Sequence, residues 1–126
     1  MFINILLVSL GGAIGAALRF TITPQIDKLF ISNFPYGIFI VNIIGCFFIG
    51  LIASLFENKL MLSENLKIFL IVGFLGSLTT FSTFALDNFN FINQKNFYLL
   101  FLNLFLTNFL GLFMVLLGIR TIKIFN

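Results

Sequence analysis

The chain of 126 residues has no histidine, no tryptophan and a single cysteine, and only 9% of its residues are charged. Cys46 alone cannot close an intramolecular disulfide, and without histidine the sequence offers no imidazole or thiolate cluster for a soft metal ion. Seven basic and four acidic residues give a formal net charge of +3, with no basic run of the kind that binds nucleic acid. These absences exclude disulfide-stabilised, zinc-binding and nucleic-acid-binding proteins.

Most of the chain is apolar. Apolar residues make up 60% of it, and the mean hydropathy is +1.17, whereas a soluble domain carries about 25% charged residues. Apolar stretches of roughly 18 to 23 residues, long enough as helices to cross a hydrocarbon core of about 30 Å, occupy 3–20, 36–56, 66–86 and 97–119. We therefore predict an all-α integral membrane protein with four transmembrane helices in a single domain over residues 1–126.

Polar connections over 23–28, 57–65 and 87–96 separate these spans. Pro24 and Pro35 bracket the first connection, as is typical where helices end and begin. With four crossings, one side of the membrane holds Lys59, Lys67, Arg120 and Lys123, and the other holds Arg19, Lys28 and Lys95. Basic residues normally mark the cytoplasmic side, so this near balance favours insertion in both orientations and an antiparallel dimer. The alternative is that these few basic residues are too small a sample to indicate an orientation in the membrane.

Small residues line one face of the first span. Gly11, Gly12, Gly15 and Ala16 allow close approach of another helix, which predicts a packed face. Arg19 follows on the same face, near the membrane margin. Its charge either snorkels to the interface or lies in an aqueous vestibule that attracts anions.

The second and fourth spans each carry amides among small residues. In the second, Asn42 begins a seam with Cys46 and Gly50, and Gly45 lies beside it. The Asn42 amide either bonds a neighbouring helix or donates N–H groups to an anion. In the fourth, the polar stripe of Asn103, Thr107 and Asn108 is either an inter-helix hydrogen-bond ladder or a pore wall.

The third span combines two glycines with five hydroxyl-bearing residues over 73–84. Such a stretch predicts a helix broken near mid-membrane, which is tolerated only where the freed backbone groups are buried in protein or line a cavity. Freed carbonyls could hold Na⁺, and freed N–H groups and hydroxyls could meet an anion. Phe81 and Phe84 lie beside them and could offer positive ring edges. The alternative is a continuous helix whose hydroxyls bond the preceding turn.

Three motifs follow one another along the chain: Gly11-Gly12-x2-Gly15-Ala16-x2-Arg19, Pro35-x-Gly37-x3-Val41-Asn42-x2-Gly45-x4-Gly50, and Gly76-x2-Thr79-Thr80-Phe81-Ser82-Thr83-Phe84. Together they resemble the Fluc fluoride channels, also called the CrcB family, over nearly the whole chain. The third motif is the most specific. The chain departs from the family pattern at Ser77, Ile38 and Asp87, where glycine, threonine and glutamate are usual.

The resemblance implies a fluoride-selective channel in the plasma membrane that lets fluoride leave the cell passively and so lowers its toxicity. It further implies an antiparallel dual-topology homodimer with two pores. A Na⁺ at the dimer centre would be held by the main-chain carbonyls of Gly76 and Thr79, and Arg19 would lie in the vestibule. The implied fluoride-pore residues are Asn42, Thr80, Phe81, Ser82, Thr83, Phe84, Asn103, Thr107 and Asn108.

Three other functions are weaker. An enzyme is not expected, because no histidine, paired carboxylate or other base is placed to activate the hydroxyls. A small proton-coupled multidrug exporter would need a membrane-embedded carboxylate, whereas Glu57, Glu64 and Asp87 all come at span ends. A non-transporting membrane subunit, packed by its glycine seams, is the third alternative.

Overall fold

The structure is a computed structural model, and it describes residues 1–58 and 63–124. Four helical stretches are long and apolar enough to cross a membrane, over 2–29, 36–57, 64–93 and 97–124, and no strand occurs in these residues. The prediction of an all-helical protein with four membrane-spanning helices is confirmed. The elements in order are α1 (Phe2–Leu29), α2 (Tyr36–Glu57), α3 (Glu64–Lys67), the π-helix η1 (Ile68–Leu75), α4 (Gly76–Leu78), α5 (Phe81–Asn93) and α6 (Phe97–Ile124).

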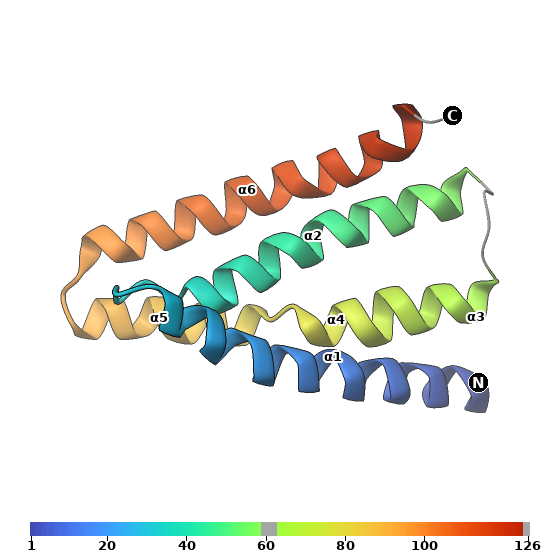
Figure 1. Cartoon of the computed structure of the whole chain (residues 1–126), viewed down its shortest axis with the longest axis horizontal. Helices are drawn as coiled ribbons and strands as arrows, with labels where there is room; N and C mark the ends of the chain where they lie inside the picture. Colours follow the sequence, from blue (N-terminus) through green and yellow to red (C-terminus); the bar gives the residue numbers. More distant parts are fainter. Residues whose placement is uncertain (59–62, 125–126) are drawn as a thin grey trace.

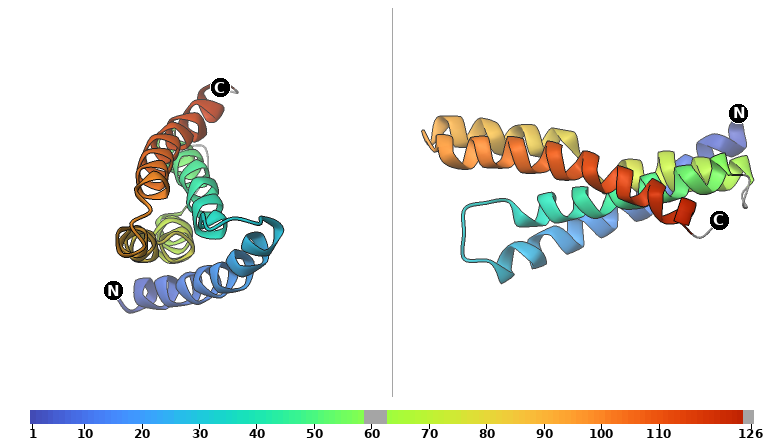
Figure 2. Two further views of the ribbon diagram at one scale, coloured as in Figure 1. Left: turned by 90° about the vertical axis from the view of Figure 1, so that its left-hand side faces the viewer. Right: turned by 90° about the horizontal axis from the view of Figure 1, so that it is seen from above.

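The four spans run along one long axis, with the start of α1 and the end of α6 at the same end of the bundle (Figure 1). The α1–α2 and α5–α6 connections lie at the opposite end (Figure 2). α2 packs mainly on α6, and α1 packs mainly on η1 and α4. Most of the long apolar side chains on the outer faces are exposed, as expected where lipid covers them.

The first connection is shorter than the sequence predicted. α1 continues through Pro24 to Leu29, so the loop expected over 23–28 is wrong. A proline removes one helical hydrogen bond, but tertiary contacts hold the following turn: Asp27 Oδ1 accepts from the Gly37 N–H at 2.7 Å. Gly37 also packs against the Thr23 carbonyl group, so close that a Cβ there would collide with it. The end of α1 is therefore fastened to the start of α2.

Two consequences follow for polar residues. Arg19 lies ten residues before the end of α1, so the helix continues roughly 15 Å beyond it. α5 likewise continues to Asn93, which makes most of the connection predicted over 87–96 helical. Asp87 and Asn88 are thus helix residues within the third span.

Glycines set the helix–helix distances, as predicted for α1. A Cβ on Gly11 would lie 2.6 Å from the Phe69 carbonyl oxygen, and one on Gly15 would collide with the Phe74 carbonyl oxygen. Gly50 and Gly118 play the same part between α2 and α6, where each meets the backbone of the other helix. Backbones approach this closely only where no side chain intervenes.

Candidate functional site

The third span is interrupted between α4 and α5. Thr79 (φ −79°, ψ 153°) and Thr80 (φ −148°, ψ 125°) are extended, and helix resumes at Phe81. Thr79 Oγ1 donates to the Leu75 carbonyl at 2.8 Å, where it competes with the helical ladder. Thr80 caps the N-terminus of α5, since its Oγ1 accepts the Thr83 N–H at 3.4 Å. The two threonines thus end one helix and begin the next.

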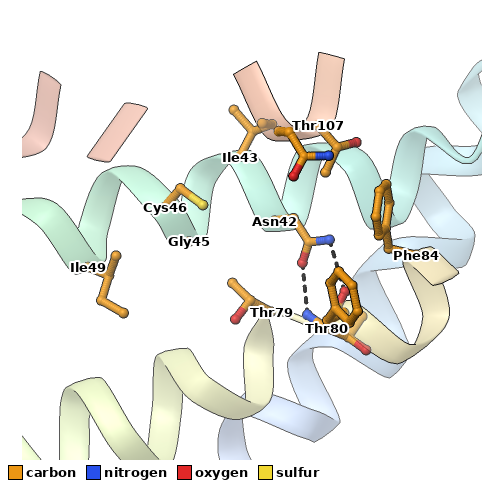
Figure 3. A pocket seen from close by; sticks show the side chains of 11 residues that line it. Asn42, Ile43, Gly45, Cys46, Ile49, Thr79, Thr80, Phe84 and Thr107 are labelled. Carbon is orange, nitrogen blue, oxygen red and sulfur yellow. Dashed lines mark hydrogen bonds between the residues drawn. The ribbon is translucent and has the colours of Figure 1, made fainter. Parts of the chain in front are cut away.

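Asn42 of α2 satisfies the extended backbone. Its Oδ1 accepts the Thr80 N–H at 2.8 Å, and its Nδ2 donates to the Thr80 carbonyl at 3.1 Å (Figure 3). The side chain is only 8% exposed. Of the two roles open to Asn42, bonding a neighbouring segment is therefore present in the structure, and one N–H of its amide is left over for another acceptor.

Gly45, almost one turn further along α2, makes room for the same extended segment. A Cβ at this position would collide with Cγ2 of Thr79. Gly45 and Asn42 together form a cradle on α2 in which Thr79 and Thr80 lie.

A pocket of about 230 Å³ opens beside this cradle, between α2, the interruption, the first turn of α5 and α6. No basic or acidic side chain lines it. Six of the predicted pore residues reach it, alongside apolar and small neighbours. The lining residues are Asn42, Ile43, Gly45, Cys46, Ile49, Thr79, Thr80, Phe81, Phe84, Thr107 and Asn108 (Figure 3).

The other predicted pore residues lie outside this pocket. Thr83 lines a second pocket of about 260 Å³ together with Arg19, Thr23 and Ile38. Ser82 Oγ lies 3.1 Å from Thr80 Oγ1, so the hydroxyls form a small cluster at the start of α5. Asn103 is 1% exposed and lies behind Thr107.

Arg19 Nε is buried and makes no hydrogen bond within the described residues. Thr23 does not supply one, because its hydroxyl donates to the Arg19 carbonyl at 2.9 Å. The guanidinium group therefore has an unused N–H donor beside the second pocket.

The two phenylalanines of the third motif have opposite surroundings. Phe84 is buried at 6% exposure and Phe81 is 77% exposed, yet their ring centroids lie only 5.6 Å apart at an interplanar angle of 46°. Phe81 therefore forms the part of the pocket wall that reaches the surface of this chain.

The interruption leaves main-chain oxygens without donors. In residues 1–58 and 63–124, no hydrogen bond reaches the carbonyls of Gly76 or Thr79, since the Thr80 N–H that would serve Gly76 in a helix goes to Asn42. Carbonyl oxygens at a helix C-terminus carry partial negative charge. They suit a hard cation such as Na⁺, whereas no group of three His, Cys, Asp or Glu side chains is found there for a metal ion.

Sequence reasoning missed several residues of the site. Ile49 lies two turns beyond Asn42 on the same face of α2, so helical periodicity could have found it, whereas Cys46, one turn beyond, was already placed in the Asn42 seam. Asn88 was assigned to a loop and overlooked. In the structure it is 7% exposed, bonded to Asn103 of α6 and to the Phe84 carbonyl.

Asp87 lies in α5 next to a polar pocket of about 320 Å³, whose other lining residues are Asn33, Pro35, Asn90, Phe91 and Gln94. Its Oδ2 is buried without a hydrogen-bond partner in the described residues. The pocket lies toward the end of the span, on the side of the α5–α6 connection, and away from the Asn42 cradle. Asp87 thus lies inside α5, six residues before its last residue Asn93, and not in the connection where the sequence placed it.

Comparison with known proteins places this architecture in a family. Residues 6–119 match the model of the family described as CrcB-like protein, Camphor Resistance (CrcB). A protein of Azobacteroides pseudotrichonymphae named fluoride-specific ion channel FluC is 42% identical over 118 residues, which is 94% of each chain. A protein of Desulfotalea psychrophila with the same name is 44% identical over 115 residues, covering 91% of this chain and 88% of its own. This multi-pass membrane protein therefore belongs to the CrcB family.

Proposed function

We propose that the chain is a fluoride-selective channel that lets fluoride leave the cell passively and so lowers cytoplasmic fluoride. The relatives named fluoride-specific ion channel support this function. The observation on which it rests in this chain is the interruption of the third span at Thr79 and Thr80, next to a pocket without charged side chains.

The pocket suits a small, strongly hydrated anion because it offers several weak donors. The free N–H groups in the first turn of α5 point toward the interruption and carry partial positive charge. The second N–H of Asn42 and the hydroxyl cluster around Thr80 add further donors. Fluoride would exchange its water for these groups while passing the edge of Phe84. Without a lysine or arginine in the pocket, no fixed charge traps the ion.

Arg19 would act at the mouth of the path. Its unbonded Nε–H and full positive charge lie at the pocket shared with Thr83, which belongs to the first turn of α5. A cation in a water-filled vestibule raises the local concentration of anions. The charge thus attracts fluoride toward the donors without binding it in the narrow part of the path.

The working unit would be an antiparallel homodimer with two pores and a central Na⁺. Two carbonyl oxygens, from Gly76 and Thr79, are too few for a hard cation, and a second copy related by a two-fold axis would supply the same two again. The exposure of Phe81 supports such a partner, because its ring would then be covered by protein. A positive ion at the centre would offset part of the cost of holding an anion in a low-dielectric site.

The test is efflux from proteoliposomes loaded with sodium fluoride or sodium chloride, containing the purified protein alone. We expect fluoride release with little chloride release, and lower fluoride release for Phe81→Ile and for Asn42→Asp, which removes a donor and adds a like charge. Equal release of both anions would overturn the selectivity. Release of neither would favour the non-transporting subunit, and drug transport that depends on a pH gradient and on Asp87 would favour the exporter.

A further inference from the structure

A chain of three hydrogen bonds runs from α6 to α5 behind the pocket, and one of the three crosses between the helices. Thr107 Oγ1 donates to Asn103 Oδ1 at 3.1 Å, and Asn103 Nδ2 donates to Asn88 Oδ1 at 3.0 Å. Asn88 Nδ2 then donates to the Phe84 carbonyl at 2.9 Å. The chain begins at the pocket, where Thr107 is a lining residue, and ends at the backbone of a second lining residue, Phe84.

The direction of this chain is fixed at its far end. A main-chain carbonyl can only accept, so Asn88 must turn its NH₂ group to Phe84 and its oxygen to Asn103. Asn103 must then present its own NH₂ group to Asn88 and its oxygen to Thr107, which leaves Thr107 as the donor. Reversal would bring the oxygen of Asn88 against the oxygen of Phe84, and two acceptors at such a distance repel.

Burial makes this direction persistent. Asn103 is 1% exposed and Asn88 is 7% exposed, so water cannot replace either partner at low cost. Both amides lie between helices that are joined by a short connection, and their mutual bond ties α5 to α6.

We infer that Asn88 is a positioning residue that keeps the hydroxyl proton of Thr107 turned away from the pocket. This inference rests on the proposed function, since it concerns one wall of the proposed fluoride path. Thr107 then faces the pocket with oxygen lone pairs, which do not bind an anion. Conduction requires sites weak enough to release the ion, and a donor fixed in this wall would hold fluoride longer.

The decisive variant is Asn88→Leu, which keeps the approximate shape of the side chain and removes the amide. The Asn103 amide is then free to turn over and donate to Thr107 Oγ1, which releases the hydroxyl proton toward the pocket. A hydrogen bond to an ion strengthens binding by about tenfold or more, so we expect at least about a tenfold fall in the half-saturating fluoride concentration for efflux. The maximal rate should fall as well, because the ion leaves more slowly. Asn88→Ala should act in the same way and serves if the leucine variant does not fold.

The same change in a Thr107→Val background separates positioning from stability. With no hydroxyl at residue 107, we expect Asn88→Leu to shift the half-saturating concentration by less than about twofold, as for sites that no longer interact. A merely structural effect of Asn88 would be equal in the two backgrounds, and that result would overturn the inference. An unchanged half-saturating concentration in the single variant would overturn it too.

A second measurement does not depend on conduction. The side-chain amide protons of Asn103, followed by NMR in micelles, should exchange slowly with water in the wild type and faster in Asn88→Leu. Fast exchange of these protons in the wild type would contradict the hydrogen-bond chain, even in a protein that conducts fluoride. Slow exchange in a protein that releases no fluoride would sink the proposed function and leave the chain intact.

Discussion

Asn42 on α2 and Thr80, 38 residues further along the chain, exchange two hydrogen bonds: Thr80 N–H to Asn42 Oδ1 at 2.8 Å, and Asn42 Nδ2 to the Thr80 carbonyl at 3.1 Å. One side chain thereby serves both polar groups of a residue that has left the helical ladder. In an apolar environment those groups would otherwise have no partner. The interruption of the third span is therefore stabilised by the second span.

Replacement of Asn42 by leucine tests this support. Asn42→Leu leaves the N–H and the carbonyl of the part-buried Thr80 without protein partners, at a cost of up to about 1 to 3 kcal/mol for each group. We expect a clearly lower thermal midpoint in detergent, together with loss of fluoride efflux. Asn108→Leu is the matched control for stability, because Asn108 is exposed and bonds only the Leu104 carbonyl of its own helix. Equal midpoints for the two variants would contradict the role of Asn42.

The contact between Gly45 and Thr79 can be tested with two substitutions, of which the second should restore the stability lost through the first. A Cβ at residue 45 would collide with Cγ2 of Thr79, so Gly45→Ala should push the extended segment out of its cradle. We expect a loss of about 1 to 3 kcal/mol, typical of overpacking, and lower efflux. Thr79→Ser removes the offending methyl group and keeps the hydroxyl that bonds Leu75. The double variant should recover most of the lost stability, and a double variant as unstable as Gly45→Ala would show that the methyl contact is not the cause.

Sequence reasoning succeeded where local periodicity carries the information. Apolar stretches of the right length predict four spans, and glycines at helical spacing predict the packed face of α1. It failed at Pro24, where the turn after the proline is held by the contact of Asp27 and Gly37, which no local pattern contains. Because the sequence analysis ended the third span at residue 86, it placed Asn88 in a loop and missed its role. The partners of Asn88 lie on α6 and one turn back on α5.

The same division applies to the site. The threonine, serine and phenylalanine cluster marks the interrupted segment, because the residue types that break and cap helices are visible in the sequence. The partner of Thr80 is not visible, since any amide in a neighbouring span could have served it. Asn42 and Asn103 are both amides in apolar helices, yet one supports extended backbone and the other belongs to a side-chain network.

Alanine substitutions at Phe81 and Phe84 should separate effects on stability from effects on fluoride conduction. Phe84→Ala opens a cavity in the core and should cost about 3 to 5 kcal/mol, because the ring is 6% exposed. Phe81→Ala should leave the stability of the single chain nearly unchanged, since that ring is 77% exposed. If the exposed ring completes a pore with a second copy, this variant still loses fluoride efflux. Thermal midpoints measured beside efflux rates check both, and an active Phe81→Ala protein would show that its ring takes no part in conduction.

Removal of sodium tests the proposed central cation. The proposed ligands are the main-chain oxygens of Gly76 and Thr79, which no side-chain substitution deletes, so the ion itself must be varied. We expect slower fluoride efflux and a weaker dimer when Na⁺ is replaced throughout by N-methyl-D-glucamine, which is too large for a carbonyl cage. Return of Na⁺ at constant ionic strength should restore both, which separates specific binding from screening. Potassium serves as the comparison, because its larger radius fits a cage built for sodium poorly. Efflux and dimer dissociation that are indifferent to the cation would show that these oxygens hold no sodium ion.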